Sequence, residues 1–194
     1  MQNKIKIGVI GLGYVGLPLA FEFAKKFEVV GYDINELRII ELNKYFDNTQ
    51  ELSTEELSEA KLLTFASNIK PLKDCNIYII TVPTPVDQAN EPDLSHIVKA
   101  SALVGSLLKQ GDTVVYESTV FPGATREYCI PVLETKSGLC LNENFGVGYS
   151  PERINPGDKD NRLTSIKKLV SGSSSQTTDL LSTIYGSIIK AGIH

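Results

Sequence analysis

The chain has 194 residues and a formal net charge of −4, with 42% hydrophobic and 22% charged residues. This balance is typical of a globular protein with a well-buried core, and without a dense Lys/Arg patch it argues against nucleic acid or an anionic membrane surface as a partner. Three scattered cysteines without a CxxC pair, and two histidines far apart in the sequence, predict reduced thiols, a cytoplasmic location and no metal site.

Strand-like and helix-like segments alternate from the start of the chain. The segment at 4–10 alternates and then turns apolar, as a strand entering a buried parallel sheet does. The glycine-dense run that follows lacks a signal-peptide cleavage site and is far shorter than the roughly 18 apolar residues of a transmembrane helix. Further strands are predicted at 28–33, 62–66 and 76–82, and helices at 14–26, 36–44 (through Leu37, Ile40 and Leu42) and 54–60 (capped by Ser53 and Glu56).

The second half of the chain continues this alternation. A helix at 94–108, capped by Asp93, precedes the strand "DTVVYEST", and "TREYCIPVL" is predicted to be helical as far as Pro131. The segments "NFGVGYS" and "SIKKLVSG" are strand-like, and a last helix is predicted at 177–190. This order predicts an α/β fold with a doubly wound, mostly parallel sheet in three α/β/α layers. Residues 1–194 then form one domain.

Three glycines in "GVIGLGYVGLPLA" match the pattern G-x-G-x-x-G between a predicted strand and a predicted helix. Gly11 would form the turn, Gly13 would let the backbone approach a pyrophosphate, and Gly16 would let the helix pack closely on the strand. The helix N-terminus offers free amides and a positive dipole end to the same pyrophosphate. The pattern therefore predicts a dinucleotide site.

An acidic residue at the end of the second strand completes the fingerprint. Asp33 would accept hydrogen bonds from the adenosine ribose and repel a 2′-phosphate, which favours NAD over NADP. Arg38 complicates this preference, because an arginine can receive a 2′-phosphate. The alternative role of Asp33 is a helix cap before Glu36.

Four stretches, in chain order, resemble the UDP-glucose/GDP-mannose dehydrogenase family. They are "IGVIGLGYVGLPLA" with the following "GYD", then "TVPTP", "ESTVFPGATRE" and "YSPERINPGD", and the similarity runs from residue 5 to about residue 172. The form "SPERINPGD" is similar to the branch that acts on UDP-N-acetylhexosamines, such as UDP-N-acetylglucosamine or UDP-N-acetylgalactosamine 6-dehydrogenases. The resemblance implies a Rossmann-like NAD-binding domain and a role in making uronic acids for surface polysaccharides.

The resemblance also implies a reaction and its residues. The C6 alcohol of a UDP-sugar would be oxidised to a carboxylate in two NAD-dependent steps, through a cysteine thioester that water cleaves. By motif, the residues expected to contact NAD are Gly11, Gly13, Tyr14, Val15, Gly16, Asp33, Arg38, Pro83, Thr84, Ser118 and Thr119. Thr119 would also position water, and Glu152 would act as base or orienter and, with Arg153, contact the substrate. The alternatives are a turn hydroxyl for Thr119 and a surface ion pair with Arg153 for Glu152.

The sequence departs from the family pattern in two ways. Pro156 stands where many UDP-glucose enzymes carry a second glutamate, which favours the acetamido-sugar branch. None of Cys75, Cys129 and Cys140 lies in the glycine-rich "GGxC" motif of the family nucleophile, so all three are expected to be structural. The catalytic cysteine, lysine and asparagine, the linking helix and the second domain are expected beyond residue 194. We therefore expect this chain to bind NAD without sugar turnover, and the full-length protein to be a homodimer or larger.

Two other functions stay open at this point. A relative of the β-hydroxyacid dehydrogenases would share the "GLGxxG" opening but has no use for "SPERINPGD". A non-catalytic NAD-sensing module would not need a catalytic thiol, and Thr119 and Glu152 would then be incidental.

Overall fold

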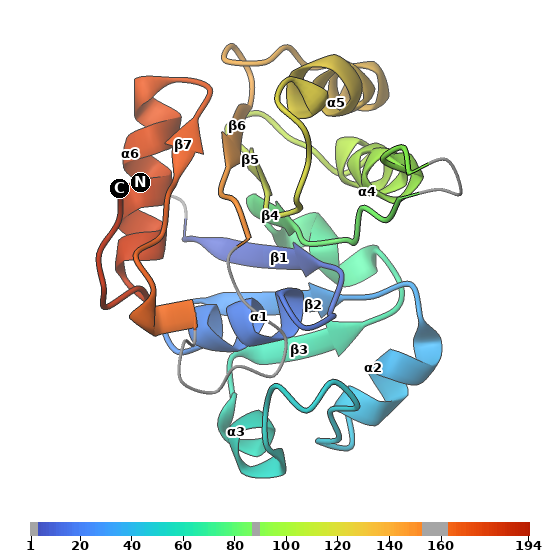
Figure 1. Cartoon of the computed structure of the whole chain (residues 1–194), viewed down its shortest axis with the longest axis vertical. Helices are drawn as coiled ribbons and strands as arrows, with labels where there is room; N and C mark the ends of the chain where they lie inside the picture. Colours follow the sequence, from blue (N-terminus) through green and yellow to red (C-terminus); the bar gives the residue numbers. More distant parts are fainter. Residues whose placement is uncertain (1–3, 87–89, 153–162) are drawn as a thin grey trace.

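A computed structural model describes residues 4–86, 90–152 and 163–194. Within them, seven strands form one sheet in the order β3-β2-β1-β4-β5-β6-β7 (Figure 1). The strands are β1 Lys6–Ile10, β2 Glu28–Tyr32, β3 Leu63–Ala66, β4 Ile77–Ile80, β5 Thr113–Tyr116, β6 Gly146–Tyr149 and β7 Ser171–Gly172. Strands β1 to β6 pair in parallel, and β7 pairs antiparallel with β6 at the edge. The predicted doubly wound, mostly parallel sheet is confirmed.

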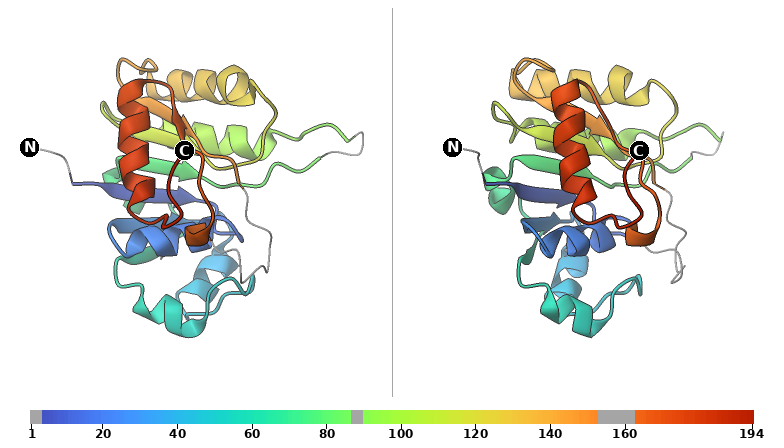
Figure 2. Two further views of the ribbon diagram at one scale, coloured as in Figure 1. Left: turned by 60° about the vertical axis from the view of Figure 1, so that its left-hand side comes forward. Right: turned by 90° about the vertical axis from the view of Figure 1, so that its left-hand side faces the viewer.

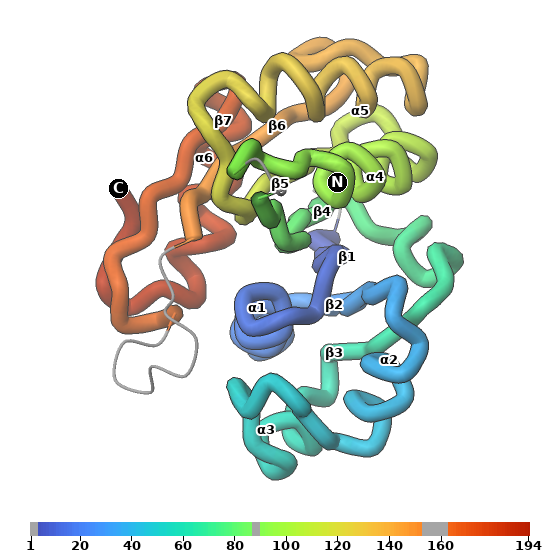
Figure 3. Tube along the Cα trace, turned by 45° about the vertical axis from the view of Figure 1, so that its right-hand side comes forward, coloured from blue at the N-terminus to red at the C-terminus, as the bar shows by residue number. Residues whose placement is uncertain are grey.

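Helices cover both faces of this sheet. They are α1 Gly16–Ala24, α2 Glu36–Leu42, α3 Thr54–Glu59, α4 Ser95–Gly105, α5 Ile130–Ser137 and α6 Ser175–Gly186. Helices α4 and α5 lie side by side in both views of Figure 2. Figure 3 shows α1 and α6 on one side of the sheet and α4 and α5 on the other. None of the helices in the described ranges is long and apolar enough to cross a membrane.

The core consists of two apolar clusters, one on each face of the sheet. Because side chains alternate along a strand, Ile7 and Val9 of β1 join the cluster under α1 and α6, whereas Ile10 joins the cluster under α4 and α5. The rings of Phe23 and Tyr185 connect α1 with α6, with an edge-to-face contact at 5.2 Å. Each fully buried large apolar side chain contributes about 1.5–3 kcal/mol, so burial on both faces stabilises the sheet whose strand ends form the site.

One predicted helix boundary is wrong. The helix over "TREYCIPVL" does not end at Pro131 but begins with a π-helical turn, Thr125–Cys129, and continues as α5 to Ser137. Pro131 lies in the first turn of α5, where a missing N–H costs little because such groups lack intrahelical acceptors. The wider turn before it is a known way to absorb a disturbed hydrogen-bond ladder. Gly138, with φ of 71°, then ends the helix in the left-handed conformation.

Three other predictions need adjustment. In α2 the buried apolar residues are Ile39 and Leu42, whereas Leu37 is 70% and Ile40 48% exposed. The strand expected over "SIKKLVSG" shrinks to β7, since the segment before it pairs through an isolated bridge with the end of the chain. The helices expected at 14–26, 94–108 and 177–190 are shorter, spanning Gly16–Ala24, Ser95–Gly105 and Ser175–Gly186. The capping box of Ser53 and Glu56 is confirmed.

Candidate cofactor-binding site

A cavity of about 690 Å³ lies at the carboxyl edge of the sheet. It opens between β1 and β4. From β1 the chain runs to β2 and β3 on one side and then crosses to β4 on the other side, so the strand order reverses here. Parallel α/β sheets bind ligands at such a switch point. Its walls come from the loops after β1, β2, β4, β5 and β6 and from one face of α4. The predicted residues on these walls are Gly11, Gly13, Tyr14, Val15, Asp33, Pro83, Thr84, Ser118, Thr119 and Glu152.

The first glycine turn is built so tightly that only glycine fits at two positions. Gly11 has φ of +98°, a conformation that side chains disfavour, and its N–H donates to the carbonyl of Tyr32 at 2.8 Å. A Cβ atom at Gly16 would collide with the carbonyl oxygen of Gly11 and with the hydroxyl of Thr81. Gly16 therefore lies behind the cavity wall and brings α1 against β1, the packing role predicted for the third glycine.

The start of α1 presents free backbone donors to the cavity. The N–H groups of Gly13, Tyr14 and Val15 have no hydrogen-bond acceptor among the residues that the structure describes. A Cβ atom at Gly13 would meet no protein atom within 4 Å, so the backbone there can be approached closely. Free amides beside the positive end of a helix dipole suit a pyrophosphate. The loop therefore fits a dinucleotide.

Asp33 lies at the end of β2 and is tied to the same loop. Its Oδ2 accepts a hydrogen bond from the N–H of Leu12 at 2.8 Å, and its Oδ1 accepts one from Asn35 at 2.9 Å. The cap of α2 is Asn35, whose side chain accepts from Leu37 and Arg38, so the alternative role of Asp33 as that cap is not observed. Each carboxylate oxygen can accept a further bond, which leaves room for a ribose diol.

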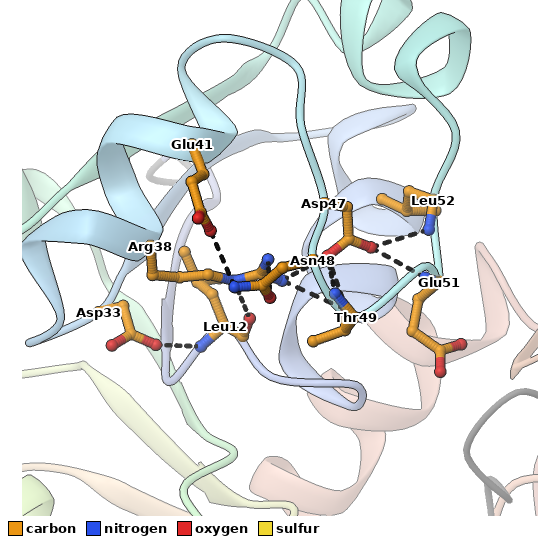
Figure 4. A network of polar contacts seen from close by, with 9 residues as sticks. All are labelled: Leu12, Asp33, Arg38, Glu41, Asp47, Asn48, Thr49, Glu51 and Leu52. Atoms are coloured by element: carbon orange, nitrogen blue, oxygen red, sulfur yellow. Dashed lines mark hydrogen bonds and ion pairs between the residues drawn. The ribbon is translucent and has the colours of Figure 1, made fainter.

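Arg38 supports the loop from behind (Figure 4). Its Nε donates to the carbonyl oxygen of Leu12 at 3.0 Å, and its guanidinium forms a buried ion pair with Asp47 at 2.7 Å. Burial opposes ionisation of Asp47, but hydrogen bonds from Thr49, Leu52 and Arg38 outweigh it and lower the Asp47 pKa. Arg38 is itself buried and is not among the lining residues of the cavity. Its predicted contact with NAD stays a prediction, and its visible role is to hold Leu12.

The far wall of the cavity is built from the loops after β4 and β5. The Thr84 hydroxyl donates to the backbone carbonyl of Thr119, which joins the two loops. The Ser118 hydroxyl donates to the carbonyl of Val82 at 2.6 Å. The Thr119 side chain itself is exposed. Thr119 is therefore held through its backbone, and its hydroxyl has no hydrogen-bond partner among the residues that the structure describes. Both its predicted role at the cofactor and the alternative role as a turn hydroxyl stay predictions.

Glu152 follows β6 and reaches the same end of the cavity. It is half-buried and lies near Glu117, a fully buried carboxylate at the end of β5 that pairs with Lys168 at 2.6 Å. Burial raises the pKa of Glu117, the Lys168 ammonium opposes that rise, and the charge of Glu152 adds to it. Arg153, predicted beside Glu152, lies outside the described residues.

Sequence reasoning missed Glu117 and Lys168. A signal for Glu117 exists in "DTVVYEST", where a charge directly follows a buried strand and costs free energy unless it is paired. No local pattern identifies Lys168 as its partner, since 51 residues separate the two.

The cysteines lie away from this chemistry. Cys75 and Cys129 are buried, and Cys140 is exposed. Burial raises the pKa of Cys75 to about 12 and also raises that of Cys129. A thiol that resists ionisation is a poor nucleophile, and none of the three lines the cavity. The structural role expected for the three cysteines stays a prediction, which burial favours for Cys75 and Cys129.

Comparison with known proteins places this geometry in a family. Residues 5–189 match the model of the UDP-glucose/GDP-mannose dehydrogenase family, NAD binding domain. The chain is 56% identical to UDP-N-acetyl-D-glucosamine 6-dehydrogenase of Pseudomonas aeruginosa, covering 100% of this chain and 46% of that protein. It is 55% identical to the enzyme of the same name from Salmonella typhi, covering 99% and 45%.

A solved structure shows the same architecture. The UDP-D-ManNAc dehydrogenase from Pyrococcus horikoshii superimposes with a TM-score of 0.88 at 32% identity, over 97% of this chain and 46% of that one. The chain thus spans about half the length of the relatives that it matches. With the glycine turn, the free amides and Asp33 at one cavity, the chain belongs to the UDP-glucose/GDP-mannose dehydrogenase family and corresponds to its NAD-binding domain.

Proposed function

We propose that this chain is the cofactor domain of a nucleotide-sugar 6-dehydrogenase that oxidises the C6 alcohol of a UDP-N-acetylhexosamine to a carboxylate. The observation that carries the proposal is that one cavity joins the glycine turn and Asp33 to Thr119 and Glu152. The similarity to two UDP-N-acetyl-D-glucosamine 6-dehydrogenases favours this sugar class. Residues 1–194 would act as one dinucleotide-binding domain, and the catalytic cysteine would come from another part of the protein.

The order of the strands gives the cavity a direction. Asp33 follows β2, the glycine turn follows β1, the loop with Thr84 follows β4, and Thr119 follows β5. Asp33 would bind the adenosine ribose, and the amides of Gly13 to Val15 would bind the pyrophosphate. Bound NAD supplies the hydride acceptor. The end of the cavity at β5 and β6 is then where the sugar alcohol would be presented.

Thr119 and Glu152 are the residues of this chain proposed to act on the reacting groups. The exposed Thr119 hydroxyl can orient the cofactor amide or a water molecule. The Glu152 carboxylate can take a proton from the water that cleaves a thioester, because a half-buried carboxylate at the cavity wall is placed for general-base work. A carboxylate and a hydroxyl at one end of the cavity suit hydrolysis better than they suit simple cofactor storage.

Binding of NAD by this chain tests the cofactor part of the proposal. Calorimetry should detect binding of NAD, with NADP at least ten-fold weaker because the Asp33 carboxylate repels a 2′-phosphate. Asp33→Ser should weaken NAD and narrow the gap to NADP. Equal affinity of the wild-type chain for both dinucleotides would contradict the role of Asp33.

NADH production from UDP-N-acetylglucosamine tests the enzymatic part, measured on the full-length protein. Glu152→Gln should reduce turnover by about 10²–10⁴-fold, the usual contribution of a general base, while NAD affinity changes little. A non-catalytic NAD sensor would show no turnover in either form. The homodimer and the cytoplasmic location stay predictions.

A further inference from the structure

Beneath the end of the cavity at β5 lies a buried ion pair that the proposed chemistry does not use. The Nζ atom of Lys168 is 2.6 Å from Oε2 of Glu117, and the two residues are 4% and 1% exposed. The other carboxylate oxygen, Glu117 Oε1, is buried without a hydrogen bond in the described structure. A charge pair removed from water is stable only with good geometry, and removing one of its partners strongly destabilises the fold. The position of this pair beside the cavity therefore points to a role for it.

The same ammonium reaches a second loop. Lys168 Nζ is 3.4 Å from the carbonyl oxygen of Pro151, the residue before Glu152. One side chain therefore connects the end of β5, which continues into Thr119, with the loop after β6, which carries Glu152.

The backbone of Lys168 is fixed as well. Its N–H donates to the carbonyl of Gly192 at 3.1 Å, and its carbonyl accepts from His194 at 2.9 Å. Because both the backbone and the ammonium group of Lys168 form hydrogen bonds, its side chain is a fixed connection between the two loops. We call this connection the Lys168 strut.

The charges around this strut are unequal. Burial raises the pKa of Glu117, Lys168 and the adjoining Tyr185 hydroxyl of α6 lower it, and the charge of Glu152 raises it. On the opposite wall, α4 contributes the exposed His96 and Lys99. Among the described residues, Lys168 is thus the buried cation that pairs with Glu117 and opposes the effect of its burial.

We propose that Lys168 is a positioning residue of the dehydrogenase: by bonding Glu117 and the Pro151 carbonyl, it sets the loops of Thr119 and Glu152 relative to each other. This inference rests on the proposed function, because it concerns the work of Glu152. It assigns no contact with cofactor or sugar to Lys168 itself.

Two substitutions remove parts of this connection. In Lys168→Met the connection between Glu117 and the Pro151 carbonyl is lost, and in Glu117→Gln the ammonium keeps the Pro151 carbonyl but loses its carboxylate partner, so both variants should lower kcat for NADH production. The loss in Glu117→Gln should be the smaller one, because a glutamine oxygen can still accept a hydrogen bond from Lys168. The double variant should resemble Lys168→Met, since both residues act through one connection. Lys167→Met is the matched control, because Lys167 is next to Lys168 in the sequence but its side chain is exposed.

Loss of the strut should also separate turnover from binding. We expect kcat of Lys168→Met to fall at least about ten-fold, as misplacement of a catalytic loop does, while KM for NAD changes less than about three-fold. Unchanged kcat in both single variants would overturn the inference, as would a matching loss of kcat in Lys167→Met or a rise of KM that accounts for the whole effect. If Lys168→Met fails to fold, Glu117→Gln decides alone. An inactive wild-type enzyme would instead refute the proposed function.

Discussion

A methyl group added at Gly16 tests how the glycine turn is built. In Gly16→Ala the new Cβ atom would overlap the carbonyl oxygen of Gly11 and the hydroxyl of Thr81, and the first of these is backbone that cannot rotate away. Overpacking of this kind costs about 1–3 kcal/mol of folding free energy. The loop would have to move, and each hydrogen bond from an amide to a charged phosphate that is lost costs about 1.5–3 kcal/mol, or about 10–150-fold in Kd.

Gly13→Ala is the matched control, because its Cβ atom meets no protein atom within 4 Å and its φ is not positive. This variant should keep or slightly raise the melting temperature, since alanine restricts the unfolded chain. It should still weaken NAD, because the methyl group stands where the pyrophosphate approaches. Thermal unfolding and calorimetry on both variants give the comparison. Wild-type stability and NAD affinity in Gly16→Ala would refute the tight-turn reasoning.

Three further outcomes follow from buried charges and thiols. Burial raises the pKa of Asp112 from 3.8 to about 6, so the folded state holds this proton more tightly and stability is lost as pH rises through about 4 to 6; at pH 8 the cost is up to about 3 kcal/mol. In urea unfolding, Asp112→Asn should therefore be more stable than the wild type at pH 8 and equally stable near pH 4. No gain in stability at pH 8 would contradict the raised pKa of Asp112. Arg38→Met should destabilise the fold by about 3–5 kcal/mol by leaving Asp47 buried and unpaired, which an unchanged melting temperature would exclude. Under native conditions Cys140 should react quickly with a thiol reagent and Cys75 only on unfolding; fast double labelling would disprove this.

The parts of the fold that depend on neighbouring residues could be predicted from the sequence. The glycine turn, the position of Asp33 at the end of β2 and the capping box at Ser53 each rest on residues a few positions apart or on one strand–helix unit. Parallel order also followed, because buried apolar strands alternate with helices.

Features that depend on distant residues could not be predicted. The ion pair of Arg38 with Asp47 could not be predicted, because only the fold brings Asp47 and its loop against Arg38. The buried face of α2 contains Arg38, Ile39 and Leu42, and Leu37 lies outside it. In the same way, the pairing of Lys168 with Glu117 exists only once β5, β6 and the end of the chain meet.

The anchoring of Leu12 by Arg38 has a consequence for how the cofactor loop could evolve. A loop held in its bound shape before the ligand arrives loses less conformational entropy on binding. Part of that preorganisation comes from the segment at 47–52. Asp47 forms an ion pair with Arg38 and accepts hydrogen bonds from the backbone N–H groups of Glu51 and Leu52. Changes in this remote segment would thus tune how long a dinucleotide stays bound without altering any residue that it touches.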